Sequence, residues 1–180
     1  MVRRLFVLSV LALAGCGAKP SNPPPPLVDL PDAATPGKLS VTSDAVPADG
    51  KIPVDFTASG VKKMPTISWS GAPADTKEFE ILIEDPEASS NPPFIHLYVT
   101  GVPGDKTSWA GDSGTMGPNS QGNNGYAPLD PPAGETHHYH FEVFALSKPI
   151  SAAPAAREGL LAAMKGPLVA KGDLIGTFGK

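Results

Sequence analysis

The octapeptide EFEILIED, residues 78–85, decides the fold class of this chain. Neighbouring side chains of a β-strand point to opposite faces, so every second residue shares a face. One face is apolar until its last position and consists of Phe79, Ile81, Ile83 and Asp85. The opposite face carries Leu82 and the glutamates Glu78, Glu80 and Glu84. This alternation predicts a strand that turns one face to a core, with Asp85 at the end of the core-facing row.

Comparable segments recur on both sides of this strand. The other expected strands are residues 38–43, 52–57, 66–69, 94–101, 137–146 and 174–178, separated by turn residues such as Asp49-Gly50 and Pro103-Gly104. One helix is expected over residues 154–165, because Pro154 suits a first helical turn and Gly166-Pro167 ends the helix. The spacing favours a mainly β domain, an antiparallel sandwich or barrel.

The composition narrows the class of protein further. Pro contributes 22 and Gly 19 of the 180 residues, which is too many helix breakers for a helical bundle. Hydrophobic residues reach 41%, which permits a packed core, and the length suits one domain. The net charge of −4, without a basic stripe, argues against a nucleic-acid partner. The lone cysteine excludes an intrachain disulfide bond.

Residues 1–15 are predicted to be a lipoprotein signal peptide. Two arginines precede the apolar run 5–14, which is shorter than the 20 or so residues of a membrane-spanning helix. The run ends in Leu13-Ala14-Gly15-Cys16, which resembles the bacterial lipobox, whose cysteine is lipidated and becomes the new N-terminus. An ordinary secreted chain is the alternative. Gly17 stands where Asp would indicate inner-membrane retention, so we expect a lipid anchor in the outer membrane, facing the periplasm.

Residues 16–37 are predicted to be the lipidated cysteine and a Pro-rich tether. Pro20 and the run 23–26 favour an extended polyproline II spacer of about 3.1 Å per residue. The folded domain is then expected to cover residues 38–180.

Three polar residues stand in apolar rows of the predicted strands: Asp85, His96 and His137. A buried carboxylate needs hydrogen-bond donors or a raised pKa, unless Asp85 simply caps the turn before Pro86. His96 lies among aromatic residues, where a core histidine is the ordinary alternative. His137 shares its face with Tyr139. These residues form one site only if the fold brings them together, which their spacing does not establish.

The run from His137 to His140 contains three histidines and could suggest a zinc site. Strand alternation places His138 and His140 on the opposite face from His137, where we expect them in solvent. No cysteine completes a tetrahedral set, so we expect no metal and no cofactor. The Gly- and Pro-rich segment 111–134 is an expected long loop. Its backbone N–H groups could hold an anion, or it could be a plain surface excursion.

Several short motifs follow one another along residues 38–180. They are Asp85-Pro86-Glu87-Ala88, His96-x-x-Val99, Gly117-x-Asn119, Gly125-Tyr126, Pro131-Pro132-x-Gly134, His137-x-Tyr139-x-Phe141, Lys171-Gly172-x-Leu174 and Gly176-Thr177-Phe178. In order and spacing they resemble the phosphatidylethanolamine-binding protein family, in particular its bacterial, Raf kinase inhibitor-like branch. The resemblance implies a large antiparallel sheet packed on a smaller one, with peripheral helices. It also implies a small pocket for phosphate-type groups, including phospholipid head groups.

The resemblance assigns the ligand-binding residues of that pocket. They are Asp85, His96, His137 and Tyr139, with Glu87 beside Asp85 and with Pro131 and Pro132 at the rim. The sequence departs from the family pattern at Glu87, Ser89, Pro118, Leu129, Asp130, His138 and Pro167. Two arginines are lost and an aspartate is gained, so the pocket mouth is less positive. This favours a zwitterionic, cationic or weakly anionic ligand, or a protein partner, over a dianionic phosphate.

The resulting functional prediction is an envelope-anchored binding module rather than an enzyme. His96 and His137 would donate hydrogen bonds to a phosphate or phosphoethanolamine-like ligand, and Asp85 would orient a histidine or accept from an amine. An inhibitor that acts on a protease or kinase through a protein interface is one alternative. A hydrolase using Asp85, His96 and His137 is another, although no activated nucleophile is apparent. A structural lipoprotein with a vestigial pocket is the third.

Overall fold

The computed structural model describes residues 22–35, 37–150 and 157–180. The predictions for residues 1–15 and for Cys16 therefore lie outside the described residues. The strands are β1 (Gly37–Lys38), β2 (Ser40–Ser43), β3 (Ile67–Ser70), β4 (Glu78–Asp85), β5 (Phe94–Pro103), β6 (Ser108–Trp109), β7 (Thr115–Met116), β8 (Thr136–Leu146) and β9 (Leu168–Gly179). The helices are α1 (Arg157–Met164) and the 3₁₀ helices η1 (Leu27–Asp29), η2 (Pro31–Ala33) and η3 (Val54–Phe56).

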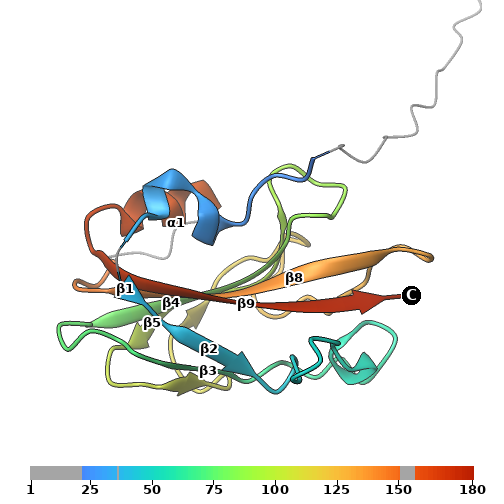
Figure 1. Cartoon of the computed structure of the whole chain (residues 1–180), viewed down its shortest axis with the longest axis horizontal. Helices are drawn as coiled ribbons and strands as arrows, with labels where there is room; N and C mark the ends of the chain where they lie inside the picture. The colour runs from blue at the N-terminus through green and yellow to red at the C-terminus, as the bar shows by residue number, and fades with distance from the viewer. Residues whose placement is uncertain (1–21, 36, 151–156) are drawn as a thin grey trace, which may run out of the picture.

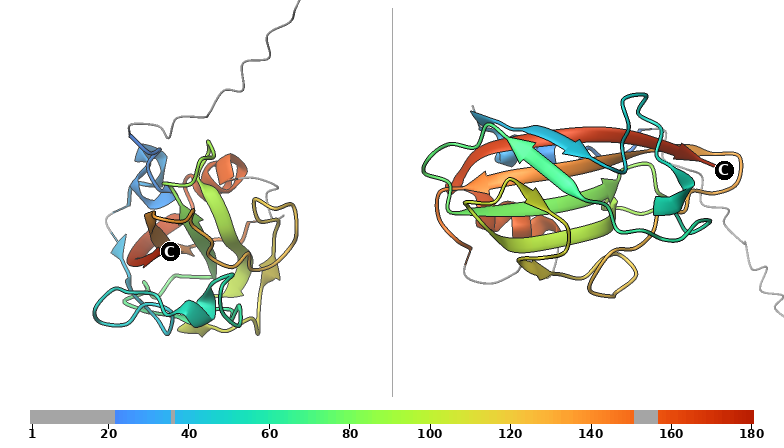
Figure 2. Two further views of the ribbon diagram at one scale, coloured as in Figure 1. Left: turned by 90° about the vertical axis from the view of Figure 1, so that its right-hand side faces the viewer. Right: turned by 90° about the horizontal axis from the view of Figure 1, so that it is seen from below.

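The strands form two packed sheets (Figures 1 and 2). Within the described residues, the larger sheet has six strands in the order β1-β9-β8-β4-β5-β7, and the smaller has three in the order β2-β3-β6. Neighbouring strands are antiparallel except β1 and β9. The main core fills the space between the sheets, where Trp69 of β3 packs against Phe79 of β4. The predicted mainly β sandwich, a large sheet on a smaller one with a peripheral helix, is confirmed.

Strand β4 lies in the middle of the large sheet and has the predicted bounds. Its odd-numbered row faces the core between the sheets, as the alternation predicts. The glutamate face, which the alternation alone would leave in water, is buried as well. A second apolar cluster covers it, in which Leu82 of β4 packs with Leu27, Phe144 and Leu160. The large sheet therefore lies between two layers, the small sheet on one side and α1, η1 and η2 on the other (Figure 1).

The C-terminal part of the predicted tether belongs to the folded domain. Leu27, Val28 and Ala33 are buried against the helix-covered face of the large sheet. Gly37 pairs with Ala170 of β9. The boundary predicted at residue 38 is therefore too late, because the apolar residues that follow the proline run find a place in the second cluster. None of the helices in the described part of the chain is long and apolar enough to cross a membrane.

Other differences concern short elements. Residues 52–57 were expected to be a strand, but Val54–Phe56 is a 3₁₀ turn, in which the Phe56 N–H donates to the Pro53 carbonyl at 3.2 Å. Pro53 has no N–H group to offer a sheet ladder. Strand β9 begins six residues before the expected strand, and the two-residue strands β6 and β7 have no signal of their own in the sequence. The expected helix is present as α1, and its predicted start at 154–156 lies outside the described residues.

Candidate functional site

The central strands bring the three predicted polar residues together. Asp85 ends β4, whose neighbours in the sheet are β5, which carries His96, and β8, which carries His137. All three residues are buried, with exposed fractions of 3%, 5% and 2% in that order. They line one pocket of about 260 Å³ at the end of the sandwich. The pocket is completed by Ala88, Ser89, Phe94, Gln121, Pro128, Asp130 and Pro132.

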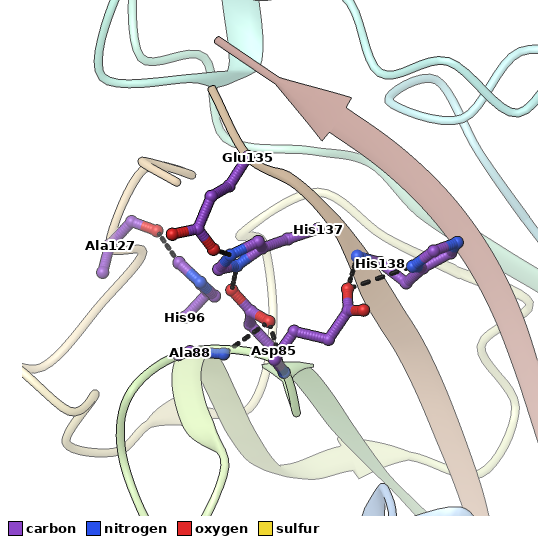
Figure 3. Close-up of polar contacts among 8 residues, drawn as sticks. Asp85, Ala88, His96, Ala127, Glu135, His137 and His138 are labelled. Atoms are coloured by element: carbon purple, nitrogen blue, oxygen red, sulfur yellow. Dashed lines mark hydrogen bonds and ion pairs between the residues drawn. The ribbon is translucent and has the colours of Figure 1, made fainter. Parts of the chain in front are cut away.

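Asp85 holds both the turn that follows β4 and the ring of His137 (Figure 3). Its Oδ1 atom accepts hydrogen bonds from the Glu87 N–H at 2.8 Å and the Ala88 N–H at 3.1 Å. Its Oδ2 atom lies 2.6 Å from His137 Nδ1. The turn-capping role and the site role are therefore both present in one carboxylate. These contacts fix the orientation of the imidazole at the bottom of the pocket.

His137 lies between two carboxylates (Figure 3). Nδ1 faces Asp85, and Nε2 lies 3.2 Å from Oε2 of Glu135. Both ring nitrogens of His137 therefore lie within hydrogen-bond distance of a carboxylate oxygen. The Glu135 side chain is 40% exposed, and sequence reasoning missed it. Its position two residues before His137, just ahead of β8, is the signal that could have found it.

His96 instead faces a backbone carbonyl. Its Nδ1 lies 2.8 Å from the Ala127 carbonyl oxygen, which can only accept, so Nδ1 carries the ring proton. Burial lowers the pKa of His96 to about 4. The ring is therefore neutral near pH 7, and Nε2 is a hydrogen-bond acceptor. The expectation that His96 donates to an anion holds only after Nε2 takes up a proton.

Tyr139 packs against the ring of His96, outside the pocket. Its buried ring meets the His96 ring edge-on, with centroids 5.4 Å apart, and it does not line the pocket. Burial raises the pKa of Tyr139, so its hydroxyl stays neutral. Within the described residues this hydroxyl has no hydrogen-bond partner. We therefore assign Tyr139 to positioning His96, rather than to ligand contact.

The remaining predicted residues divide between the pocket and its surroundings. Pro132 lines the rim, whereas Pro131 is buried behind it. Glu87 does not line the pocket, because the turn after β4 directs its Oε2 toward His138, whose N–H donates to it at 2.6 Å. Burial raises the pKa of Glu87, but the hydrogen bonds from His138 outweigh this and lower it. Glu87 is thus an ionised neighbour of the site.

The histidines that follow His137 lie on the other face of β8. His138 is exposed, as expected, but His140 is largely covered and lies 2.8 Å from Oδ2 of Asp173. That ion pair raises the pKa of His140, although burial opposes the shift. The three histidines therefore do not converge on one point.

The loop 111–134 forms one wall of the pocket through Gln121, Pro128 and Asp130. Asn119 stabilises its tip, because its Oδ1 accepts from the Gln121 N–H at 2.9 Å and its Nδ2 donates to the Gly125 carbonyl at 3.0 Å. The loop is thus an ordered part of the site.

Acidic groups outnumber cationic ones around the pocket. Asp85 and Asp130 line it, Glu135 reaches His137, and no Lys or Arg is found among the described lining residues. Lys180 pairs with Asp130 at the edge. The pocket therefore combines the imidazoles of His96 and His137 with several carboxylates. Such a set suits a small ligand that carries charges of both signs.

The class of protein is therefore a β-sandwich of a large and a small sheet, with an Asp–His pocket at the ends of its central strands. The family model described as phosphatidylethanolamine-binding protein matches residues 42–179 of this chain. The chain belongs to that family.

Named relatives agree with this membership. The protein named "Putative lipoprotein LppC" of Mycobacterium tuberculosis is 34% identical, over 94% of this chain and 90% of its own length. Among solved structures, the "Putative PhosphatidylEthanolamine-Binding Protein (PEBP) Homolog CT736" of Chlamydia trachomatis is 30% identical, with a TM-score of 0.71 over 80% of this chain and 99% of its own. YbcL of E. coli, described as a member of the mammalian PEBP family, shares the fold at 24% identity and a TM-score of 0.69, over 79% of this chain and 99% of its own.

Proposed function

We propose that this protein is a lipid-anchored binding module whose pocket takes a small zwitterionic ligand of the phosphoethanolamine type. The observation that carries the proposal is the position of His137 between Asp85 and Glu135. A purely anionic ligand would meet the negative charge of these carboxylates. A ligand with both charges can place its anionic end near the imidazole and its ammonium near the acids. A pocket of about 260 Å³ suits a head group.

The geometry supports binding over catalysis. In a catalytic Asp–His pair, the second ring nitrogen is the general base that activates a nucleophile. Here Nε2 of His137 faces the Glu135 carboxylate instead. Ser89 lines the same pocket, and no hydrogen bond joins it to His137 in the described structure. We propose that the pocket is not an enzyme active site.

Anchoring in the cell envelope is the second part of the proposal. Because the LppC relative matches 94% of this chain, the matched stretch includes Cys16 and the Pro-rich residues that follow. That relative's name contains the word lipoprotein. Together with the lipobox, this supports a lipid anchor at Cys16. We place the anchor in the outer membrane, facing the periplasm, on the basis of Gly17.

Isothermal titration calorimetry tests the ligand class. Phosphoethanolamine, inorganic phosphate and ethanolamine are titrated separately into the protein and its His137→Ala variant. We expect phosphoethanolamine to bind most tightly, and His137→Ala to lose about tenfold or more in affinity, the value of one charge-assisted hydrogen bond. His138→Ala is the matched control, because His138 is exposed and outside the pocket. Equal affinities of wild type and His137→Ala would contradict the proposal.

A further inference from the structure

A strap formed by residues 25–34 crosses the large sheet on the side of α1 (blue in Figure 1). Leu27 and Ala33 have no exposed surface, and Val28 is nearly as buried. They pack on Leu82 of β4 and on Leu160 of α1. The segment that follows the proline run is therefore one layer of the fold.

Four charged side chains of the domain bind the backbone of this strap. The Val28 N–H donates to Glu142 Oε1 at 2.9 Å, and the Leu27 N–H donates to Glu84 Oε1. Arg157 Nη2 donates to the Pro25 carbonyl at 2.8 Å, and Lys171 Nζ donates to the Val28 carbonyl. We call this set the socket, formed by Glu84, Glu142, Arg157 and Lys171. It holds the strap, which contains the 3₁₀ helices η1 and η2, by its main-chain groups.

The socket depends on the strap for its own hydrogen bonds. Glu84 and Glu142 are fully buried, and Arg157 nearly so. Arg157 Nε also donates to Glu84 Oε2 at 2.7 Å, which pairs those two charges. Glu142 Oε2 has no partner in the described structure, so the Val28 N–H is important for this carboxyl group. Lifting the strap would leave buried polar groups unsatisfied, which is costly.

The strap also determines where the chain leaves the domain. Residues 22–26 line a groove together with Pro86, Glu87 and His138. Those three residues adjoin Asp85 and His137 of the pocket. The chain thus departs at the pocket end of the sandwich (Figure 1). From Asn22 to Cys16 there are six residue steps, which reach at most about 22 Å when fully extended. A tether that is free up to residue 38 would instead reach roughly 70 Å.

We infer that the docked strap sets the orientation of the anchored domain on its membrane. It holds the pocket end of the sandwich next to the lipid surface, within reach of the short link between Cys16 and Asn22. The partner of this end of the molecule is the bilayer that contains the anchor. The inference rests on the proposed lipidation of Cys16. In this orientation the mouth of the pocket lies near the membrane surface. Ligands at that surface then reach the pocket before ligands in bulk solution do.

Energy transfer between the protein and its membrane tests this arrangement. The full lipidated chain is reconstituted in phosphatidylcholine vesicles that contain a lipid-linked acceptor dye. Acylation occupies Cys16, so Ser89→Cys and Ala74→Cys each provide a single labelling site. Both residues are exposed, and they lie beyond opposite ends of β4, whose eight residues span about 25 Å. We expect transfer from position 89 to exceed transfer from position 74 by roughly twofold or more.

A lengthened link provides the decisive variant, because it leaves the fold untouched. Fifteen Gly and Ser residues inserted between Gly17 and Ala18 should sharply lower transfer from position 89. If the whole predicted tether were free, the same insertion would change little. Equal transfer from positions 89 and 74, or no response to the insertion, overturns the inference.

Two further readouts separate this inference from the proposed function. Hydrogen exchange in the full chain should show protected amides at Leu27 and Val28, and unprotected amides would overturn the docked strap. Flotation with the vesicles reports the anchor, and its failure overturns both the anchoring and this inference. Calorimetry with phosphoethanolamine reports the pocket alone, so a failure there leaves the strap result standing.

Discussion

At the scale of single residues, the site depends on the hydrogen-bond partners of three buried side chains, Asp85, His96 and His137. His137 meets a carboxylate at each ring nitrogen, and His96 donates through Nδ1 to a backbone carbonyl. The two imidazoles therefore present different chemistry to a ligand. His137 is flanked by two carboxylates, and His96 presents a neutral acceptor nitrogen.

Under the proposed function, Glu135 is expected to compete with anionic ligands for His137. Replacing it by the isosteric Glu135→Gln removes one negative charge beside the imidazole. Since this side chain is 40% exposed, the effect is modest, and we expect phosphate affinity to rise roughly two- to fivefold. Calorimetry at pH 7 measures it. Glu158→Gln, on the exposed side of α1, is the control and should change nothing. Weaker phosphate binding by Glu135→Gln would show that this carboxylate assists the ligand.

His96 makes anion binding depend on pH. With its pKa near 4 in the free protein, His96 must take up a proton to donate from Nε2 to an anion. A bound anion raises that pKa, so affinity should rise as pH falls from 7 toward 4, by less than tenfold per pH unit, and level off below 4. Aminoethylsulfonate is a suitable probe, because its anionic group does not titrate in this range. His96→Gln should flatten the profile, and an unchanged profile in this variant would exclude His96 as the titrating group.

At the scale of elements, strand β4 shows what the alternation of apolar and polar residues predicts and what it does not. Its odd-numbered row was predicted, because an apolar face has to meet a core. The burial of its glutamate face was not, since that depends on α1 and the strap, which come from distant parts of the chain. The strap was not predicted, because the proline run before it favours an extended tether. The two-residue strands were not predicted, because each forms only by pairing with its neighbour in the sheet.

The same reasoning applies to the site. Asp85, His96 and His137 were found because each breaks an apolar row. Glu87 was assigned to the pocket from its place in the motif, but the turn fixed by Asp85 points it toward His138. Glu135 was missed, because it precedes β8 and interrupts no apolar pattern. The sequence therefore identifies single polar residues within apolar rows. It does not show in which direction a turn places the side chains that follow a strand.

Burial of Glu80 in β4 predicts a loss of stability at alkaline pH. Burial raises the pKa of Glu80 to about 10, and its hydrogen bond with Glu78 adds to the shift. Above pH 5 the unfolded chain loses this proton while the folded chain keeps it. Stability therefore falls as pH rises to about 10, by at most about 1.4 kcal/mol per pH unit from this group.

The variant Glu80→Gln tests this pH dependence. It removes the titrating group and keeps its shape, so it should be more stable than wild type at pH 8 and have a flatter pH profile. Denaturant unfolding between pH 5 and 9 measures both. Glu158→Gln should follow wild type, and a Glu80→Gln profile as steep as that of wild type would contradict the assignment.

At the scale of the whole molecule, the described structure brings two features to one end of the sandwich. The sandwich presents a small polar pocket at the ends of β4, β5 and β8, and the strap brings the chain that leads to Cys16 to the same end. Family membership establishes the fold and its class. In the pocket, acidic side chains surround the histidines: Asp85 and Glu135 contact His137, and Asp130 lines the wall.

Native mass spectrometry of the protein, purified without phosphate, tests the binding of a small ligand in this pocket most directly. It is compared with the His96→Ala, His137→Ala double variant before and after addition of phosphoethanolamine. The account predicts a one-to-one adduct in the wild type that the double variant loses. An adduct of equal abundance in both proteins, or none in the wild type at millimolar phosphoethanolamine, would contradict it and point to a protein partner instead.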